Sequence, residues 1–403
     1  MKNPYQKTIY ACFAAYVVQA VVNNFVPLLF LTFQDSYHIP LSQITLLVTF
    51  NFGLQLLVDL ASVGFVDRIG YRASMVLAHA LAAAGLALLA ILPDALPSPF
   101  PGILLSVMVY AAGGGLLEVV VSPVVEACPS GRKEQEMSLL HSFYCWGHVA
   151  VVLLSTAFFS LFGTEHWRIL ALMWALIPLG NLFAFLRVPI APLIEGGGKG
   201  MALGELARNK MFWVFLLMML CAGASEQGVS QWASTFAEKG LGVSKTVGDL
   251  AGPMAFAVLM GTSRAVYGRY GGRLNLDRFM AGSALLCAAA YLCIALVPSP
   301  AVGLIGCAVC GLSVGIMWPG TFSKAAAGLP RGGTALFALL ALAGDMGCSG
   351  GPTLVGMVSS ALGDDLRKGI LAGIVFPVLL MAGLALSRSG MKAPNGNDKP
   401  PHL

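Results

Sequence analysis

Charged side chains are scarce in this chain of 403 residues: Asp, Glu, Lys and Arg make up only 11% of it, against about 25% in soluble proteins. Hydrophobic residues account for 57%, and the mean hydropathy is +0.79. So few charges cannot cover a soluble domain, which excludes a soluble enzyme or binding module. The net charge of +5 is spread between apolar segments rather than gathered on one module, so we expect no nucleic-acid partner.

The motifs of several chemistries are also missing. The sequence holds no nucleotide-binding P-loop, no GxSxG elbow, no HExxH helix and no His-x3-His spacing. Cys307 and Cys310 form a CxxC pair inside an apolar stretch, without a second pair or polar flanks. We therefore expect no metal and no cofactor, and neither an ATP-driven pump nor a membrane enzyme.

Long apolar segments are abundant instead. A helix needs about 20 mostly apolar residues to cross a bilayer. Twelve segments of the sequence meet this need: 8–33, 41–65, 73–93, 102–127, 136–162, 167–188, 211–237, 247–267, 276–297, 302–326, 333–360 and 367–388. The first has no convincing cleavage site, so we interpret it as a span rather than a signal peptide.

The basic residues alternate along the connections between these segments. Lys and Arg recur around 68–72, 132–133 and 187–210, whereas 94–101 and 298–301 carry none. The positive-inside rule then places both termini and the central loop in the cytoplasm. The high content of Ala, Gly and Cys favours the inner membrane of a prokaryote, and we expect a multi-pass protein that acts as a monomer in the lipid bilayer.

An internal repeat relates the two halves of the chain. Residues 70–93 align with residues 275–298 without a gap, and both segments end on an aliphatic residue and a proline. Such repeats place a substrate site between the halves, near the middle of the membrane. We predict an all-α membrane protein of twelve transmembrane helices in two six-helix bundles related by pseudo-two-fold symmetry. The expected parts are an N-terminal bundle over 1–188, a cytoplasmic linker over 189–210 and a C-terminal bundle over 211–403.

The loop after the second segment carries a family signature. It reads GFVDRIGYR over residues 64–72. This is similar to the Gly, Asp-Arg, Gly and basic pattern of the major facilitator superfamily, except that the first glycine stands one position closer to the Asp. The resemblance covers nearly the whole chain and implies a secondary transporter. Asp67 would pair with Arg68, with Arg72 or with the opposite half of the chain, and this contact would act as a gate. The alternative is that the segment is only a turn whose basic residues follow the positive-inside rule.

A narrower resemblance involves the first, fourth and fifth segments. Residues 115–123 resemble the fourth-span motif of the fucose-permease-like sugar:proton symporters, and residues 138–147 resemble the start of their fifth span. Asn23 and Asn24 fit the first-span pattern of that subfamily. The acidic residue that follows the Asn pair in those proteins is replaced here near Pro27, which puts proton coupling through the first span in doubt.

Carboxylates inside apolar segments are the strongest functional signal. Each costs roughly 3 kcal/mol or more in the membrane unless it faces a cavity or a water-filled path. Ser122 and Glu126 follow Glu118 at +4 and +8, on one helical face. We predict that Glu118 and Ser122 bind substrate and that Glu118 also couples an ion; a carboxylate locked to a neighbouring helix is the alternative. Asp345 is the second candidate for ion coupling.

Other polar residues complete the predicted substrate site. Arg264 and Lys324 are candidate salt-bridge partners of Asp345, and Asp59 lies one turn beyond Gln55, toward the cytoplasmic end. The seventh segment carries a carboxylate, two amides and an indole within two helical turns, namely Glu226, Gln227, Gln231 and Trp232. Such groups could bind a polyhydroxylated solute; the alternative is that they form a belt at the membrane interface. His141 and His148, with Tyr144 between them, could relay a proton or donate to the substrate, or could pack as neutral histidines. The remaining predicted substrate-binding residues are Asn24, Asn51, Gln55, His141, Tyr144, Glu226, Gln227, Gln231, Trp232 and Trp318.

Together these features predict a secondary active transporter that works by alternating access. The expected cargo is a small polar organic solute, a sugar or polyol by resemblance, carried with H+ or Na+ as a symporter. A drug or metabolite exporter that runs as an H+ antiporter is the alternative, although the fifth segment lacks the GP-x-x-GG run of many such proteins. A solute sensor without transport is a third reading, disfavoured by the small cytoplasmic surface.

Overall fold

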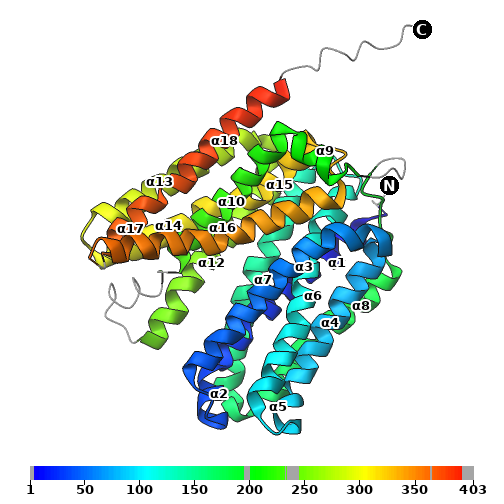
Figure 1. Ribbon diagram of the computed structural model, residues 1–403, viewed down its shortest axis with the longest axis vertical. Coiled ribbons are helices and arrows are strands. Elements are labelled where there is room, and N and C mark those ends of the chain that lie inside the picture. The colour runs from blue at the N-terminus through cyan, green and yellow to red at the C-terminus, as the bar shows by residue number, and fades with distance from the viewer. Residues whose placement is uncertain (1–3, 195–199, 232, 234–244, 364, 393–403) are drawn as a thin grey trace.

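The structure is a computed structural model that describes residues 4–194, 200–231, 233, 245–363 and 365–392. Figure 1 shows two groups of long helices, inclined to each other, with the beginning of α1 and the end of α18 on the same side of the molecule. That side is called the terminal side below. The architecture is the predicted one of twelve transmembrane helices in two six-helix bundles.

The first bundle contains the first six spans and their short connecting helices. Its elements are α1 (Gln6–Asn24), η1 (Val26–Leu29), α2 (Phe30–Tyr37), α3 (Leu41–Ile69), α4 (Tyr71–Leu89), α5 (Leu92–Ala95), α6 (Pro99–Ala127), α7 (Lys133–Phe162), η2 (Thr164–His166) and α8 (Trp167–Arg187). These bounds agree with the predicted segments to within a few residues, because long apolar runs fix the position of a span.

The second bundle contains the other six spans. Its elements are α10 (Lys210–Ser230), α12 (Lys245–Tyr270), η4 (Gly271–Arg273), α13 (Leu276–Leu296), α14 (Pro300–Val314), α15 (Met317–Gly328), α16 (Gly333–Ala361), α17 (Leu366–Gly373) and α18 (Val375–Lys392). Among the described residues, eleven helical segments are long and apolar enough to cross a membrane. The more polar α12, which contains the buried Arg264, provides the remaining span, the eighth in chain order.

Three spans are interrupted where the backbone cannot continue a regular helix. In the first span Pro27 lies in the short η1, since proline lacks an N–H group and clashes with the preceding turn. The tenth span breaks between α14 and α15, at Gly315 and Ile316. The twelfth breaks at Ile374, between α17 and α18. Such breaks free backbone carbonyls, and one of them is used in the site described below.

Small residues bring helices into close contact inside each bundle. In the second bundle a Cβ atom at Gly347 or Gly351 of α16 would collide with the backbone of Leu220 or Ala224 in α10. Glycine therefore lets these two backbones touch, as is common in membrane helices. On the outside, large apolar side chains such as Leu161 stay exposed, as expected for a surface that faces lipid tails.

The bundles meet through α7 with α12 and through α3 with α16. On the terminal side the stretch between the bundles contains the short helix α9 (Leu203–Arg208). There the N–H of Met201 donates to the carbonyl of Arg331 (2.8 Å), and the hydroxyl of Thr8 donates to the carbonyl of Pro189 (2.5 Å). The boundaries predicted for the two bundles and for the linker are not tested by these contacts and remain a prediction.

Candidate functional site

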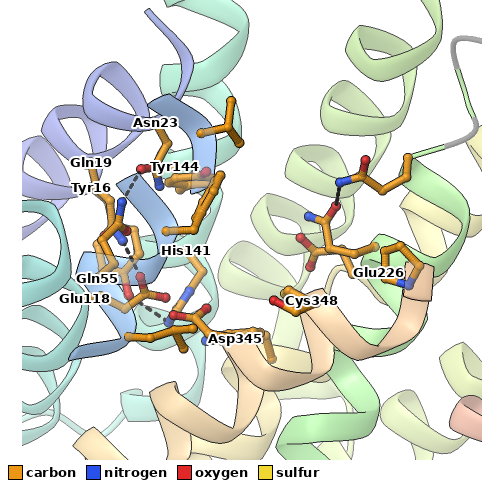
Figure 2. Close-up of a pocket in the computed structure, with 18 of the residues that line it drawn as sticks. Tyr16, Gln19, Asn23, Gln55, Glu118, His141, Tyr144, Glu226, Asp345 and Cys348 are labelled. Atoms are coloured by element: carbon orange, nitrogen blue, oxygen red, sulfur yellow. Dashed lines mark hydrogen bonds between the residues drawn. The ribbon is translucent and has the colours of Figure 1, made fainter. Parts of the chain in front are cut away.

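A cavity of about 390 Å³ lies between the two bundles, at the level where α1, α3, α6 and α7 face α10, α12, α15 and α16. Figure 2 shows polar side chains pointing into it from both sides. Its wall consists of Tyr16, Gln19, Asn23, Val48, Phe52, Gln55, Leu56, Glu118, His141, Tyr144, Glu226, Gln227, Gln231, Arg264, Trp318, Asp345, Cys348, Ser349 and Pro352.

Amide side chains of the first bundle form one wall. The Asn23 Oδ1 atom accepts hydrogen bonds from Gln55 Nε2 (2.8 Å) and from Asn51 Nδ2 (3.3 Å). The Gln19 Nε2 atom donates to Glu118 Oε2 at 2.7 Å. Because Gln19 and Asn23 are four residues apart on α1, both reach the cavity from one helical face. Glu118 thus has a neutral partner and no bound cation among the described residues.

Beneath this wall, three side chains form a buried polar cluster. The Tyr16 hydroxyl lies 3.0 Å from Ser122 Oγ, and His141 Nε2 lies 3.3 Å from Ser122 Oγ and 3.4 Å from the Tyr16 hydroxyl. Across the interface the His141 ring stacks on Phe322 of the second bundle, with centroids 5.8 Å apart. The arrangement fixes the orientation of His141 at the cavity wall.

The wall of the second bundle is built around a buried arginine. Arg264 Nη2 lies 3.3 Å from Glu226 Oε2, and its Nε atom donates to the carbonyl of Gly315 (2.8 Å), which the helix break leaves free. Its Nη1 atom donates across the interface to the carbonyl of His141 (3.2 Å). A buried guanidinium is tolerated only when its donors are paired in this way. Gln227 and Gln231 lie beside this pair, with their amides 3.5 Å apart.

Asp345 faces Glu118 from the other bundle (Figure 2). Neither cation that the sequence suggested as its partner is bound to it. Arg264 is engaged by Glu226, and Lys324 pairs with Asp277 at 2.5 Å on the terminal side. Each candidate cation is thus paired with another carboxylate, and the salt bridge considered for Asp345 is formed with neither of them. Within the described part of the chain, Glu226 is the one carboxylate of the three lining the cavity that is paired with a cation.

Trp318 provides the aromatic part of the wall. It lies in α15, just after the break in the tenth span, and its ring packs against Gly344, where any Cβ atom would collide with it. The ring makes an edge contact with Phe322, with centroids 6.3 Å apart. Most of the side chain is buried, and it lines the cavity.

The predicted gate residues lie on the terminal side, where the bundles touch. Asp67 accepts a hydrogen bond from the hydroxyl of Thr334 in the opposite bundle, and the Tyr71 hydroxyl lies 2.5 Å from the same Thr334 oxygen. Arg72 instead binds the carbonyls of Phe185 and Val188 at 2.6 and 2.9 Å. Asp67 therefore contacts the opposite half, and Arg72 ties down the end of α8 rather than Asp67. Arg68 is exposed.

The structure brings most of the predicted substrate residues to the cavity and leaves some away from it. Gln55, Glu118, His141, Tyr144, Glu226, Gln227, Gln231, Trp318 and Asp345 line the wall. Asn51 and Ser122 are buried behind it, and the Asn24 amide donates to the carbonyl of Ala20 (2.8 Å). Trp232 lies outside the described residues.

Sequence reasoning missed ten wall residues, and four of them, Tyr16, Gln19, Asn23 and Arg264, carry polar groups described above. A signal for the first three was available, because Gln19 and Asn23 are polar at i and i+4 inside an apolar span and Tyr16 precedes Gln19 by three. Arg264 was considered only as a partner of Asp345. The high cost of a cation at membrane depth marks it as a site residue in its own right.

Comparisons with known proteins agree with this arrangement. The model of the Major Facilitator Superfamily matches residues 11–352. The membrane protein MosC of Rhizobium meliloti is 24% identical over 296 residues, which cover 72% of this chain and 70% of MosC.

Solved structures with the same fold include three transporters. The E. coli fucose:proton symporter FucP in its outward conformation matches with a TM-score of 0.81 and 18% identity, covering 95% of this chain and 99% of FucP. The proton:xylose symporter XylE, bound to 6-bromo-6-deoxy-D-glucose, matches at 0.78 and 12%, covering 95% of each chain. The human organic anion transporter MFSD10 matches at 0.71 and 16%, covering 94% of this chain and 99% of that one. Likeness at such identities shows the fold alone.

Proposed function

Because the chain belongs to the Major Facilitator Superfamily, and is therefore a membrane transporter and not an enzyme, we propose that it carries a sugar or polyol together with a proton. The observation that carries this proposal is the wall of the central cavity, which combines amides from both bundles, uncompensated carboxylates and one tryptophan edge. The similarity in fold to sugar:proton symporters supports it.

The amide groups suit a solute with several hydroxyl groups. Gln19, Asn23 and Gln55 face the cavity from one bundle, and Gln227 and Gln231 face it from the other. Each amide offers both donors and acceptors, which hydroxyl groups require, whereas Trp318 offers an apolar edge for C–H groups. The volume of about 390 Å³ falls in the usual range of roughly 300–1,000 Å³ for small-molecule sites.

The charges of the cavity favour proton coupling. Glu226 is balanced by Arg264, so Glu118 and Asp345 together leave the cavity with excess negative charge when both are ionised. A proton bound at one of these carboxylates removes part of this negative charge. We therefore assign the coupling role to Glu118 or Asp345, and we expect H+ rather than Na+ as the coupling ion.

We further propose that the terminal side faces the cytoplasm of a prokaryotic cell and that this structure is the outward-facing state. Lys and Arg are concentrated in the connections on that side, as the positive-inside rule requires. The contacts of Asp67, Tyr71 and Thr334 hold the bundles together there. Transport would require these contacts to break while contacts on the other side form.

Solute-driven proton movement in proteoliposomes tests the proposal. A sugar or polyol supplied outside should alkalinise the external medium, and Glu118→Gln should abolish this signal, because the amide cannot release a proton. Glu165→Gln is the matched control, since Glu165 is exposed in η2, away from the cavity. Solute uptake that proceeds without proton movement would refute the coupling. No response to any sugar or polyol would refute the solute class.

One observation favours an exporter of amphipathic cations as the second candidate. Val48, Phe52 and Leu56 add an apolar face to the cavity, beside the uncompensated carboxylates. A lipophilic cation could bind there and leave in exchange for protons. Proton-driven accumulation of such a cation in inverted vesicles, combined with no sugar response, would place this function first.

A further inference from the structure

A fourth buried carboxyl group lies just below the cavity floor. Asp59 is on α3, one turn beyond Gln55 toward the terminal side, and its side chain is 0% exposed. Both of its carboxyl oxygens are buried, and no donor within the described part of the chain reaches either of them. A buried, unpartnered carboxyl group is costly, and therefore demands an explanation.

The group that faces Asp59 is another acid. The carboxyl group of Asp345, on α16 of the opposite bundle, lies within hydrogen-bonding reach of it. Two ionised carboxylates only accept hydrogen bonds, so they can bind each other only when they share a proton. Asp345 also lines the cavity, whereas Asp59 does not.

The other charged groups around the pair do not neutralise it. Glu118 on α6 lies close to both acids, and Glu226 on α10 lies close to Asp345, so both add negative charge. The nearby cations are engaged elsewhere, Arg264 by Glu226 and Lys324 of α15 by Asp277. On α4, His79 is bonded to the carbonyl of Met75 and to Asn181; on α17, Lys368 pairs with Asp365. The described residues hold no cluster of three or more His, Cys, Asp or Glu side chains suited to a metal ion.

The pair also belongs to the contact that closes the terminal side. Asp59 with Asp345 and Asp67 with Thr334 are two contacts along the same antiparallel pair of helices, α3 and α16, here called the seam. The eight residues from Asp59 to Asp67 span about 12 Å of helix. Ser62, whose hydroxyl is buried without a partner, lies between them on α3.

We propose that Asp59 and Asp345 form a proton-binding pair at the seam, filled from the cavity through Asp345 and emptied to the terminal side through Asp59. Asp345 takes a proton from water in the cavity and donates it to the carboxylate of Asp59, which holds the seam closed. When the bundles separate, Asp59 meets water on the terminal side and releases that proton.

This inference rests on the proposed proton coupling, but the test reads the conformation directly and needs no solute. Spin labels at Arg187→Cys and Arg273→Cys, two exposed positions in different bundles on the terminal side, report the separation of the bundles. The accessible Cys293 and Cys348 are first replaced by serine. Distance distributions from electron–electron double resonance are then recorded in detergent or nanodiscs as the pH is raised.

When both acids of the pair are intact, the terminal side should open as the pair loses its shared proton. Between about pH 6 and about pH 9 we expect the closed population to fall about fivefold or more, because two facing carboxylates repel. In Asp59→Asn the amide can donate to Asp345 at every pH, so the terminal side should stay closed throughout. Asp345→Asn should also keep the terminal side closed at every pH. If Asp59→Asn does not fold, Asp345→Asn alone tests whether the pair controls opening. Glu165→Gln, far from the pair, should match the unsubstituted protein.

A pH response that persists in both Asn variants would overturn the inference, and so would opening that follows Na+ instead of pH. The two proposals fail separately. If solute-driven alkalinisation is lost in Glu118→Gln but the Asn variants open normally with pH, the pair is wrong and the proton coupling stands. If no solute moves protons but the pH response vanishes in both Asn variants, the pair stands and the proposed symport is wrong.

Discussion

The two bundles present the same side chain, a glutamate, to the cavity, but they hold it in opposite ways. Glu118 receives a hydrogen bond from the neutral amide of Gln19, whereas Glu226 lies against the guanidinium of Arg264. A buried carboxylate beside a cation stays charged and holds structure together, and one beside an amide can gain or lose a proton at lower cost. We propose that this difference separates a structural acid, Glu226, from an acid available for coupling, Glu118.

The strongest test of this comparison removes the cation. Arg264→Met should lower the free energy of unfolding by about 3–5 kcal/mol, because it leaves Glu226 buried without a partner and the Gly315 and His141 carbonyls without a donor. Thermal unfolding in detergent measures the loss. Arg264→Met combined with Glu226→Gln should recover much of it, and a single variant as stable as the parent protein would contradict the structural role of the pair.

The next test concerns the contact that closes the terminal side. Thr334→Val keeps the shape of the side chain but removes the hydroxyl that bonds Asp67 and Tyr71, so the closed state should lose about 1–2 kcal/mol. The spin-label distances should then shift toward the open population at neutral pH. Thr262→Val is the matched control, because the Thr262 hydroxyl bonds only to its own helix. Equal distributions in both variants would show that the contact does not hold the gate.

The smallest effect is expected for the substitution of Glu118, the glutamate of the first bundle. Glu118→Gln should change the free energy of unfolding by no more than about 0.5 kcal/mol, because the new amide oxygen can still accept from Gln19. Glu226→Gln leaves Arg264 without its counter-charge and should cost more. Parallel thermal melts rank the two variants. If Glu118→Gln proves the less stable, Glu118 is a structural acid and the comparison fails.

The sequence was sufficient for the spans and for much of the cavity wall. Apolar runs of helical length locate each span, and isolated polar residues such as Glu118 and Asp345 signal where a cavity must be, since lipid tolerates neither. The sequence could not predict which of the buried side chains pair with each other. Arg264 and Glu226 are 38 residues apart, and whether Arg264 turns to Glu226 or Asp345 depends on how helices rotate against each other, which periodicity in one span does not define.

Asp59 illustrates the same limit from another direction. Its place one turn beyond Gln55 is evident in the sequence, and this suggested only a position toward the cytoplasmic end. Its significance comes from the antiparallel register of α3 and α16, which puts it opposite Asp345. Register between helices that are distant in the sequence is set by how their side chains pack, and this packing emerges only in three dimensions.

The length of α16 gives the seam the geometry of a lever. Thr334 and Asp345 are eleven residues apart, or about 16 Å along the helix axis. If α16 pivots near the cavity, a tilt of about 10° displaces Thr334 by about 3 Å, enough to exceed hydrogen-bonding distance, while Asp345 barely moves. In the proposed cycle, the outer contact with Asp67 would then break before the carboxyl pair separates. Water would reach the seam from the rim inward, and the length of α16 would set the order of these events.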